Sequence, residues 1–271
     1  MKRFATGLAA LALAVPAAAQ ETQAAADEPR VLAVVAHPDD EVIFAPVLSS
    51  LRAEGADVSI VYATSGDAGP GVSDMEKGEE LAQYREGEAL CASETLGLGR
   101  PVFWRLGDGT LGTNAHHPGS PAQRFLEQLE ALVEKERPDL VFTWGPDGGY
   151  GHADHRMVGA LVAQVLQRLD APRPILLYAG IPKGTKPAIP QLADWGETAP
   201  ELLDVTFPYS AEDLAAAARA VQCHRSQFDA ETRAGLIPLF HTSIWRGKGH
   251  FRYAFPVMSL LPLEPPETVR D

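Results

Sequence analysis

The chain has 271 residues, 45% of them hydrophobic and 7% aromatic, which is enough to bury a core in one large domain or two small ones. Its formal net charge is −13, and this acidic balance excludes a nucleic-acid-binding protein that relies on a general basic field. Beyond the N-terminus no apolar run reaches about eighteen residues, so no membrane span is expected in the mature chain.

The first twenty residues differ in character from the rest of the chain. Lys2 and Arg3 precede a long apolar run, and Ala17 and Ala19 then fit an A-x-A cleavage pattern. This order is typical of a signal peptide and predicts a secreted or periplasmic protein, with a buried N-terminal helix as the alternative. The predicted organisation is a signal peptide over residues 1–19, a solvated lead-in over residues 20–29 and a single α/β domain over residues 30–271.

Strand-like runs alternate with helix-like segments along that domain. Short apolar runs predict strands at 31–36, 58–64, 101–106, 140–145, 175–181 and 203–207. Amphipathic patterns predict helices near 41–54, 76–96, 121–136, 154–169 and 211–227. The alternation indicates right-handed βαβ crossovers, and hence a Rossmann-like, mostly parallel sheet with helices on both faces.

Polar loops follow the first four predicted strands. Ligands of open α/β sheets bind at the carboxyl ends of the strands, so these loops should meet at one rim. None of them matches the G-x-G-x-x-G or Walker pattern, so a nucleotide site is not supported despite the layout.

The loop after the first strand carries clustered acids. His37 is followed by Pro38 and then by Asp39, Asp40 and Glu41. Carboxylates this close repel one another and lose hydration at a sheet edge, and a divalent metal is the simplest way to offset that cost. A helix N-cap is the alternative interpretation, but a single aspartate would satisfy it.

A second cluster follows the fourth strand, where His152 and His155 have the same three-residue spacing as His37 and Asp40. Catalytic zinc sites use three nitrogen or oxygen ligands and leave one position open. We therefore predict two ligands from the first loop and one from the second, with Asp39 beside the open position as a base for water. By itself, the second cluster could also be a solvated pair of histidines.

The two clusters resemble the motifs of a known family. AHPDDE after the first strand and GGYGHADH after the fourth are similar to the PIG-L/LmbE-like zinc-dependent N-deacetylases. Arg85-x-x-Glu88 in a helix, LGDGTL at residues 106–111 and the late element His224-Arg-Ser-Gln extend the resemblance over roughly residues 30–228.

The resemblance implies a set of metal ligands and a reaction. His37, Asp40 and His155 would bind zinc, with ferrous iron as the alternative metal. Asp39 would be the general base, and Tyr150 would help to polarise the amide carbonyl. Core packing over the glycine-rich loop is the alternative for Tyr150.

The resemblance also implies roles for residues around the metal. His152, oriented by Asp154, would protonate the leaving amine or stabilise the oxyanion. Arg85 would lie near the substrate, with a surface ion pair to Glu88 as the alternative. His224 would also lie close to the substrate, although its match to the family is weaker.

The resulting functional prediction is a zinc-dependent hydrolase that removes an N-acetyl group from a small-molecule N-acetylated sugar or sugar conjugate. Two alternatives remain: another amide or ester acyl hydrolase on the same metal site, and a non-catalytic carbohydrate-binding protein. A structural zinc site is disfavoured because Cys91 and Cys223 lie near neither cluster. Whether these cysteines form a disulfide, and what the oligomeric state is, stay open at this stage.

Overall fold

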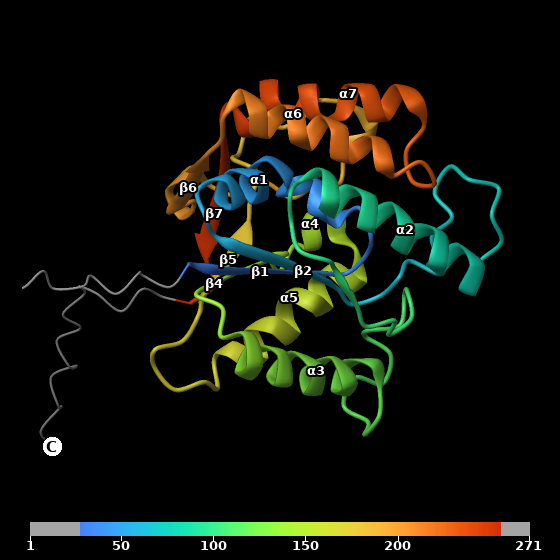
Figure 1. Ribbon diagram of the computed structural model, residues 1–271, viewed down its shortest axis with the longest axis vertical. Coiled ribbons are helices and arrows are strands. Elements are labelled where there is room, and N and C mark those ends of the chain that lie inside the picture. Colours follow the sequence, from blue (N-terminus) through green and yellow to red (C-terminus); the bar gives the residue numbers. More distant parts are fainter. Residues whose placement is uncertain (1–27, 256–271) are drawn as a thin grey trace, which may run out of the picture.

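The computed structural model describes residues 28–255 and is built around a seven-stranded sheet (Figure 1). The strands are β1 (Arg30–Val35), β2 (Asp57–Tyr62), β3 (Val102–Phe103), β4 (Leu140–Thr143), β5 (Ile175–Ala179), β6 (Val205–Pro208) and β7 (Lys248–Tyr253). The helices are α1 (Ala45–Ala53), α2 (Glu79–Thr95), α3 (Pro121–Glu136), α4 (Gly148–Gly151), α5 (Ala153–Leu166), α6 (Ala211–Ala220) and α7 (Ala230–Phe240). The short turns are η1 (Asp40–Ile43), η2 (Pro190–Leu192), η3 (Pro200–Leu202), η4 (Val221–Cys223) and η5 (His241–Trp245). The predicted signal peptide lies outside the described residues.

The sheet is mostly parallel, which confirms the predicted fold class. Its order is β3-β2-β1-β4-β5-β7-β6, and the first five strands in that order pair in parallel. The last two, β7 and β6, pair antiparallel. Strand β7 and helix α7 were not predicted, because β7 is mostly polar and α7 contains Pro238. The helix predicted over 211–227 ends earlier, at Ala220.

Strand β1 is buried on both faces, as its unbroken apolar run predicts. Leu32 and Val34 pack in a core that includes side chains of α3 and α5, whereas Val31, Ala33 and Val35 pack in a core that includes α1. Helices α6 and α7 form a further layer over α1 and α2, on the side of the sheet opposite α3 and α5 (Figure 1). No helix within residues 28–255 combines the length and apolarity needed to cross a membrane.

The order in which the strands are added to the sheet reverses at β1. From β1 the chain crosses to β2 on one side, and β4 later pairs with the other side. In open parallel sheets a crevice forms at the carboxyl ends of the strands at this switch point. His37 follows β1 and the segment 145–155 follows β4, so the fold brings both predicted clusters to the same crevice.

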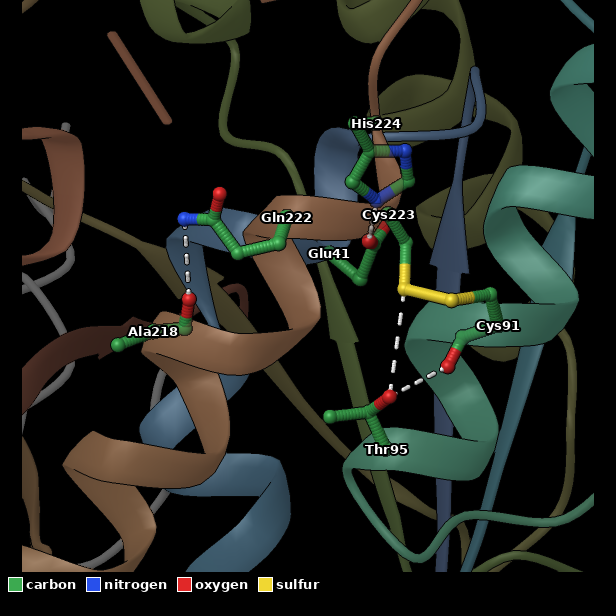
Figure 2. The surroundings of a disulfide bond; sticks show 7 residues. All are labelled: Glu41, Cys91, Thr95, Ala218, Gln222, Cys223 and His224. Atoms are coloured by element: carbon green, nitrogen blue, oxygen red, sulfur yellow. Dashed lines mark hydrogen bonds and ion pairs between the residues drawn. A yellow bond between two sulfur atoms is a disulfide. The ribbon is translucent and has the colours of Figure 1, made fainter. Parts of the chain in front are cut away.

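A disulfide joins Cys91 in α2 to Cys223 at the end of η4, across a sequence separation of 132 residues (Figure 2). The Oγ1 hydroxyl of Thr95 donates a hydrogen bond of 2.7 Å to the carbonyl of Cys91. The question left open by the sequence is thereby answered in favour of a disulfide, which ties the outer helical layer to α2.

We predict that replacing both cysteines (Cys91→Ser, Cys223→Ser) lowers the free energy of unfolding by about 2–5 kcal/mol, because the crosslink restricts a long loop in the unfolded chain. Urea unfolding of the variant, compared with the wild type in the presence and absence of reductant, measures this. Equal urea midpoints for all three samples would contradict the prediction.

Candidate metal and catalytic site

The turn after β1 is organised around the carboxylate of Asp40. Its Oδ2 accepts hydrogen bonds from the backbone N–H groups of Ala36 at 2.9 Å and His37 at 3.0 Å, and from Nε1 of Trp144 at 3.1 Å. Three donors on one oxygen orient the carboxylate and leave Oδ1 facing His155. The nearby His155 and His37 side chains hold the pKa of the buried Asp40 below its usual value, although burial alone would raise it.

Three side chains from the two predicted clusters converge at this point. Nε2 of His155 lies 3.0 Å from Oδ1 of Asp40 and 3.2 Å from Nδ1 of His37. Nδ1 of His37 lies 3.8 Å from the other oxygen of Asp40. Ligand atoms about 2.0–2.2 Å from one ion are about 2.8–3.6 Å apart at tetrahedral to octahedral angles. Both contacts of His155 fall within the range for a small divalent cation, and the 3.8 Å contact of His37 lies just above it.

Both histidines are held from outside by the contacts that metal ligands usually have. Nε2 of His37 lies 3.0 Å from Oδ1 of Asp108, and Nδ1 of His155 lies 3.1 Å from the carbonyl of Gly148. The Trp144 ring stacks on His155 with a centroid distance of 4.5 Å. Burial would lower the pKa of His37, but the neighbouring carboxylates, Asp108 first, raise it to about 10. The site therefore attracts positive charge strongly.

Two other groups of donors lie close together among the described residues. Ring nitrogens of His37, His152 and His155 lie within 4.8 Å of one another, and so do atoms of His37, Asp108 and Asp154. The second group uses the face of His37 that points away from Asp40. Asp39 and Asp40 both line an open pocket, so the Asp40 side of His37 is the one that a substrate can reach.

Asp39 has a backbone conformation that a side chain other than glycine rarely adopts, with φ 106°. Its N–H donates to Oε2 of Glu41 at 3.0 Å. Arg85 donates from Nη2 to the carbonyl of Pro38 at 2.6 Å and to Oδ1 of Asp39 at 3.3 Å. Burial raises the pKa of Asp39, and Arg85 only partly opposes this, so that the pKa is about 6.

Glu41 and His224 form a buried ion pair beneath this turn (Figure 2). Tyr62 also donates its hydroxyl to Glu41, at 2.8 Å. Burial opposes both charges, but their mutual attraction prevails, lowering the pKa of Glu41 and raising that of His224. His224 is 0% exposed and lies close to the site, but it presents no surface to a substrate in this structure. It acts on the site through Glu41, which accepts from the backbone of Asp39.

Three residues of α2, spaced three apart on one face of the helix, support the site: Arg85, Glu88 and Cys91. Arg85 reaches the turn of Asp39, and Glu88 accepts from the N–H and hydroxyl of Ser226 at 2.7 and 2.6 Å. Cys91 is bonded to Cys223. Arg85 is 3% exposed, so the alternative of a surface ion pair with Glu88 is wrong. Arg85 lies next to the site, because it holds the turn of Asp39.

The segment before α5 places His152 and Tyr150 at the mouth of the site. Nδ1 of His152 accepts the N–H of Asp154 at 3.2 Å and caps α5, so the neutral ring carries its hydrogen on Nε2. Burial, with the nearby His37 and His155, lowers the pKa of His152. Tyr150 is 43% exposed, and its ring centroid lies 5.2 Å from that of His155.

Asp154 contacts His152 through its backbone N–H, whereas its carboxylate has other partners. It accepts from the N–H groups of Gly109 at 2.7 Å and Leu111 at 3.3 Å, and one oxygen lies 3.5 Å from Nε2 of His37. Only the backbone of Asp154 bonds to His152. Its side chain therefore supports His37 and the loop after β3.

Sequence analysis missed four residues of the site: Glu41, Tyr62, Asp108 and Trp144. Glu41 and Asp108 were visible in the quoted motifs HPDDE and LGDGTL, and each follows a strand. Tyr62 and Trp144 had no such signal, because an aromatic residue at the end of a buried strand is most simply explained as core.

Comparison with known proteins agrees with these motifs. Residues 32–166 match the family described as PIG-L: GlcNAc-PI de-N-acetylase. A relative from Corynebacterium diphtheriae, 1D-myo-inositol 2-acetamido-2-deoxy-alpha-D-glucopyranoside deacetylase, is 33% identical over 230 residues. That match covers 73% of this chain and 76% of the relative.

Solved structures resemble the fold at lower sequence identity. N,N'-diacetylchitobiose deacetylase from Pyrococcus horikoshii has a TM-score of 0.62 at 20% identity, over 87% of this chain and 90% of that one. A 4-carboxy-2-hydroxymuconate hydratase from Pseudomonas putida has a TM-score of 0.61 at 14% identity, over 86% and 99%. Since these neighbours carry out different reactions, the fold alone does not decide the chemistry.

Asp108→Asn should weaken zinc binding by about 10–100-fold, because His37 loses the carboxylate that orients its ring. Competition with a chromophoric chelator measures the affinity. Asp57→Asn, which changes an exposed aspartate at the start of β2, is the matched control and should bind zinc as the wild type does. Equal affinities for the two variants would contradict the assigned contact.

His224→Ala should lower the free energy of unfolding by about 3–5 kcal/mol, because it leaves Glu41 buried without its charged partner. His117→Ala, at an exposed loop position, should change it by less than about 0.5 kcal/mol. Urea unfolding of both variants gives the comparison, and a loss at His224 as small as that at His117 would show that the pair does not stabilise the fold.

Proposed function

Because this chain belongs to the PIG-L family of GlcNAc-PI de-N-acetylases, we propose that it is a metal-dependent hydrolase that removes the N-acetyl group of an N-acetylated sugar or sugar conjugate. Hydrolytic N-deacetylation is the activity of its named relatives. The corynebacterial relative is named for an acetamido sugar joined to inositol, and the archaeal structural neighbour for a diacetylated disaccharide. A small N-acetylated sugar is therefore the substrate class that fits best.

One observation carries the proposal. Nε2 of His155 lies 3.0 Å from Oδ1 of Asp40 and 3.2 Å from Nδ1 of His37, which in turn lies 3.8 Å from Oδ2 of Asp40, and Asp39 and Asp40 line the adjacent pocket. We assign His37, Asp40 and His155 as the metal ligands. Two imidazoles and one carboxylate suit zinc, and also ferrous iron.

When bound, a divalent metal such as zinc would act as a Lewis acid, activating water and polarising the amide carbonyl. The residues around it supply the proton transfers. Asp39 accepts a proton from the attacking water, and Arg85 and Glu41 hold its side chain and backbone in place for this step. A non-catalytic binding protein would not need this arrangement of a base beside three metal-ligating groups.

His152 and Tyr150 are placed to act on the other side of the amide. The neutral His152 ring presents Nε2–H, because Nδ1 is used to cap α5. It stabilises the oxyanion through Nε2–H, and the proton that Asp39 takes from water passes to the leaving amine. Partial burial raises the pKa of Tyr150, so its hydroxyl stays neutral and donates to the carbonyl oxygen of the substrate.

We also propose that the protein acts outside the cytoplasm. The N-terminal pattern over residues 1–19 supports this, although it lies outside the described residues. The Cys91–Cys223 disulfide supports it independently, because such bonds form and persist in oxidising compartments.

Acetate release from a panel of N-acetylated monosaccharides, disaccharides and glycosides tests the function. Wild-type protein should release acetate only after zinc is supplied to a chelator-treated sample. Asp39→Asn should lower the rate by about 10²–10⁴-fold through loss of the base, while its zinc affinity stays within a few-fold of the wild type. Asp57→Asn is the control and should be fully active. Undiminished activity of Asp39→Asn would rule out the assigned base.

A further inference from the structure

A cavity of 460 Å³ opens directly beside the catalytic residues. Asp39, Asp40 and Tyr150 are among the residues that line it. Volumes of about 300–1,000 Å³ are typical of pockets that hold drug-sized ligands. The cavity therefore has room for a group attached to the sugar or to its acyl carbon, in continuity with the place where the amide reacts.

Six apolar side chains that line this cavity form what we call the apolar wall: Ile43, Leu192, Trp195, Phe228, Leu236 and Phe240. The aromatic rings continue from the site into the wall. The centroid of Trp195 lies 5.5 Å from that of Tyr150 and 6.2 Å from that of Phe240. The other polar side chains that line the cavity, Gln191, Asp194 and Thr232, are exposed.

The loop that carries Trp195 is held in place by backbone contacts. The N–H of Gly196 donates to the carbonyl of Gly149 at 2.7 Å, which joins the loop to the segment of Tyr150. The ammonium group of Lys186 donates to the carbonyl of Trp195 at 2.8 Å. A wall that is already in position binds a ligand without paying to order the loop, so its apolar surface favours binding directly.

We propose that the substrate carries an apolar substituent, an aromatic ring or a short alkyl chain, next to its N-acylated amino sugar, and that the apolar wall binds it. This inference rests on the proposed function and specifies its substrate class. Six apolar side chains cannot satisfy a ring of sugar hydroxyls, which would lose their hydrogen bonds to water in contact with them. An apolar group gains about fourfold in binding for each methylene that it buries.

The substituent could be the aglycone of a glycoside or a longer N-acyl chain, and two substrate arms distinguish these sources. The first compares N-acetylglucosamine with its phenyl and butyl glycosides, and the second compares it with N-butanoylglucosamine. The zinc-loaded wild type should turn over the preferred apolar substrate with a kcat/KM at least roughly tenfold above that for N-acetylglucosamine. Equal kcat/KM values across both arms would overturn the inference and leave the proposed function intact.

Leu236→Ala and Phe228→Ala should reduce that preference by at least roughly fivefold, because each removes part of the apolar wall. Leu202→Ala, at an exposed leucine that does not line the cavity, is the matched control and should keep it. Zinc content and thermal unfolding confirm that each variant is folded. A preference that survives in both wall variants would place the apolar group elsewhere and overturn the assignment.

Calorimetry with zinc-loaded Asp39→Asn protein separates this inference from the proposed function, because binding does not require turnover. The phenyl or butyl glycoside, or N-butanoylglucosamine, should bind at least roughly tenfold more tightly than N-acetylglucosamine, and adding Leu236→Ala should remove most of the difference. Such binding with no acetate release by the wild type would support the apolar wall and contradict the deacetylase proposal. No difference in binding would overturn the inference whatever the enzyme hydrolyses.

Discussion

Three consecutive carboxylates lie at the carboxyl end of β1, with Asp40 and Glu41 buried and Asp39 partly buried, and their repulsion has to be balanced by positive charge. The fold balances each acid separately, with a partner from a different part of the chain: Arg85 for Asp39, His155 for Asp40 and His224 for Glu41. Arg85 and His224 balance Asp39 and Glu41 as side-chain charges, without a metal ion. A metal cation would contribute most to the balance of charge between His37, Asp40 and His155, because the Asp108 carboxylate supplies further negative charge behind His37. The chemistry of the site and the stability of the turn thus depend on the same compensation.

Helix α2 is the element that couples this compensation to the rest of the molecule. Its face presents Arg85 to the turn of Asp39, Glu88 to Ser226 and Cys91 to Cys223. The disulfide and the Glu88 contact hold the chain on either side of His224, so they position the histidine that pairs with Glu41. Glu41 in turn accepts the N–H of Asp39, a residue whose positive φ costs about 1–3 kcal/mol and persists only when its surroundings determine it. The disulfide and the Glu88 contact therefore support the turn of Asp39 through His224 and Glu41, without touching substrate themselves.

The difference between local spacing and contacts across the fold explains how much of the structure could be predicted from the sequence. The strand–helix alternation and the two clusters at strand ends depend on local spacing, and they correctly predicted the parallel sheet and the meeting of His37 with His155. The partners across the fold depend on packing between distant segments, which spacing does not encode. Arg85 and His224 were therefore placed in the correct neighbourhood, but their partners, the turn of Asp39 and Glu41, were not predicted. The same holds for the carboxylate of Asp154, which lies near His37 while the backbone N–H bonds His152. Strand β7 was missed because its side chains, apart from Phe251, are mostly polar or only partly buried.

The residues proposed for the reaction and those proposed for substrate specificity lie in different parts of the chain. Every residue assigned to metal binding or proton transfer lies within residues 32–166, the range that matches the family, whereas most of the apolar wall comes from residues 192–240. The two parts meet at Tyr150 and Trp195, whose loops are joined by the hydrogen bond between Gly196 and Gly149. Changes in the later segment can therefore reshape the pocket while the distances among the metal-ligating groups stay as they are. The reaction follows from the first part of the chain, and the choice of substrate follows from how the second part closes over it.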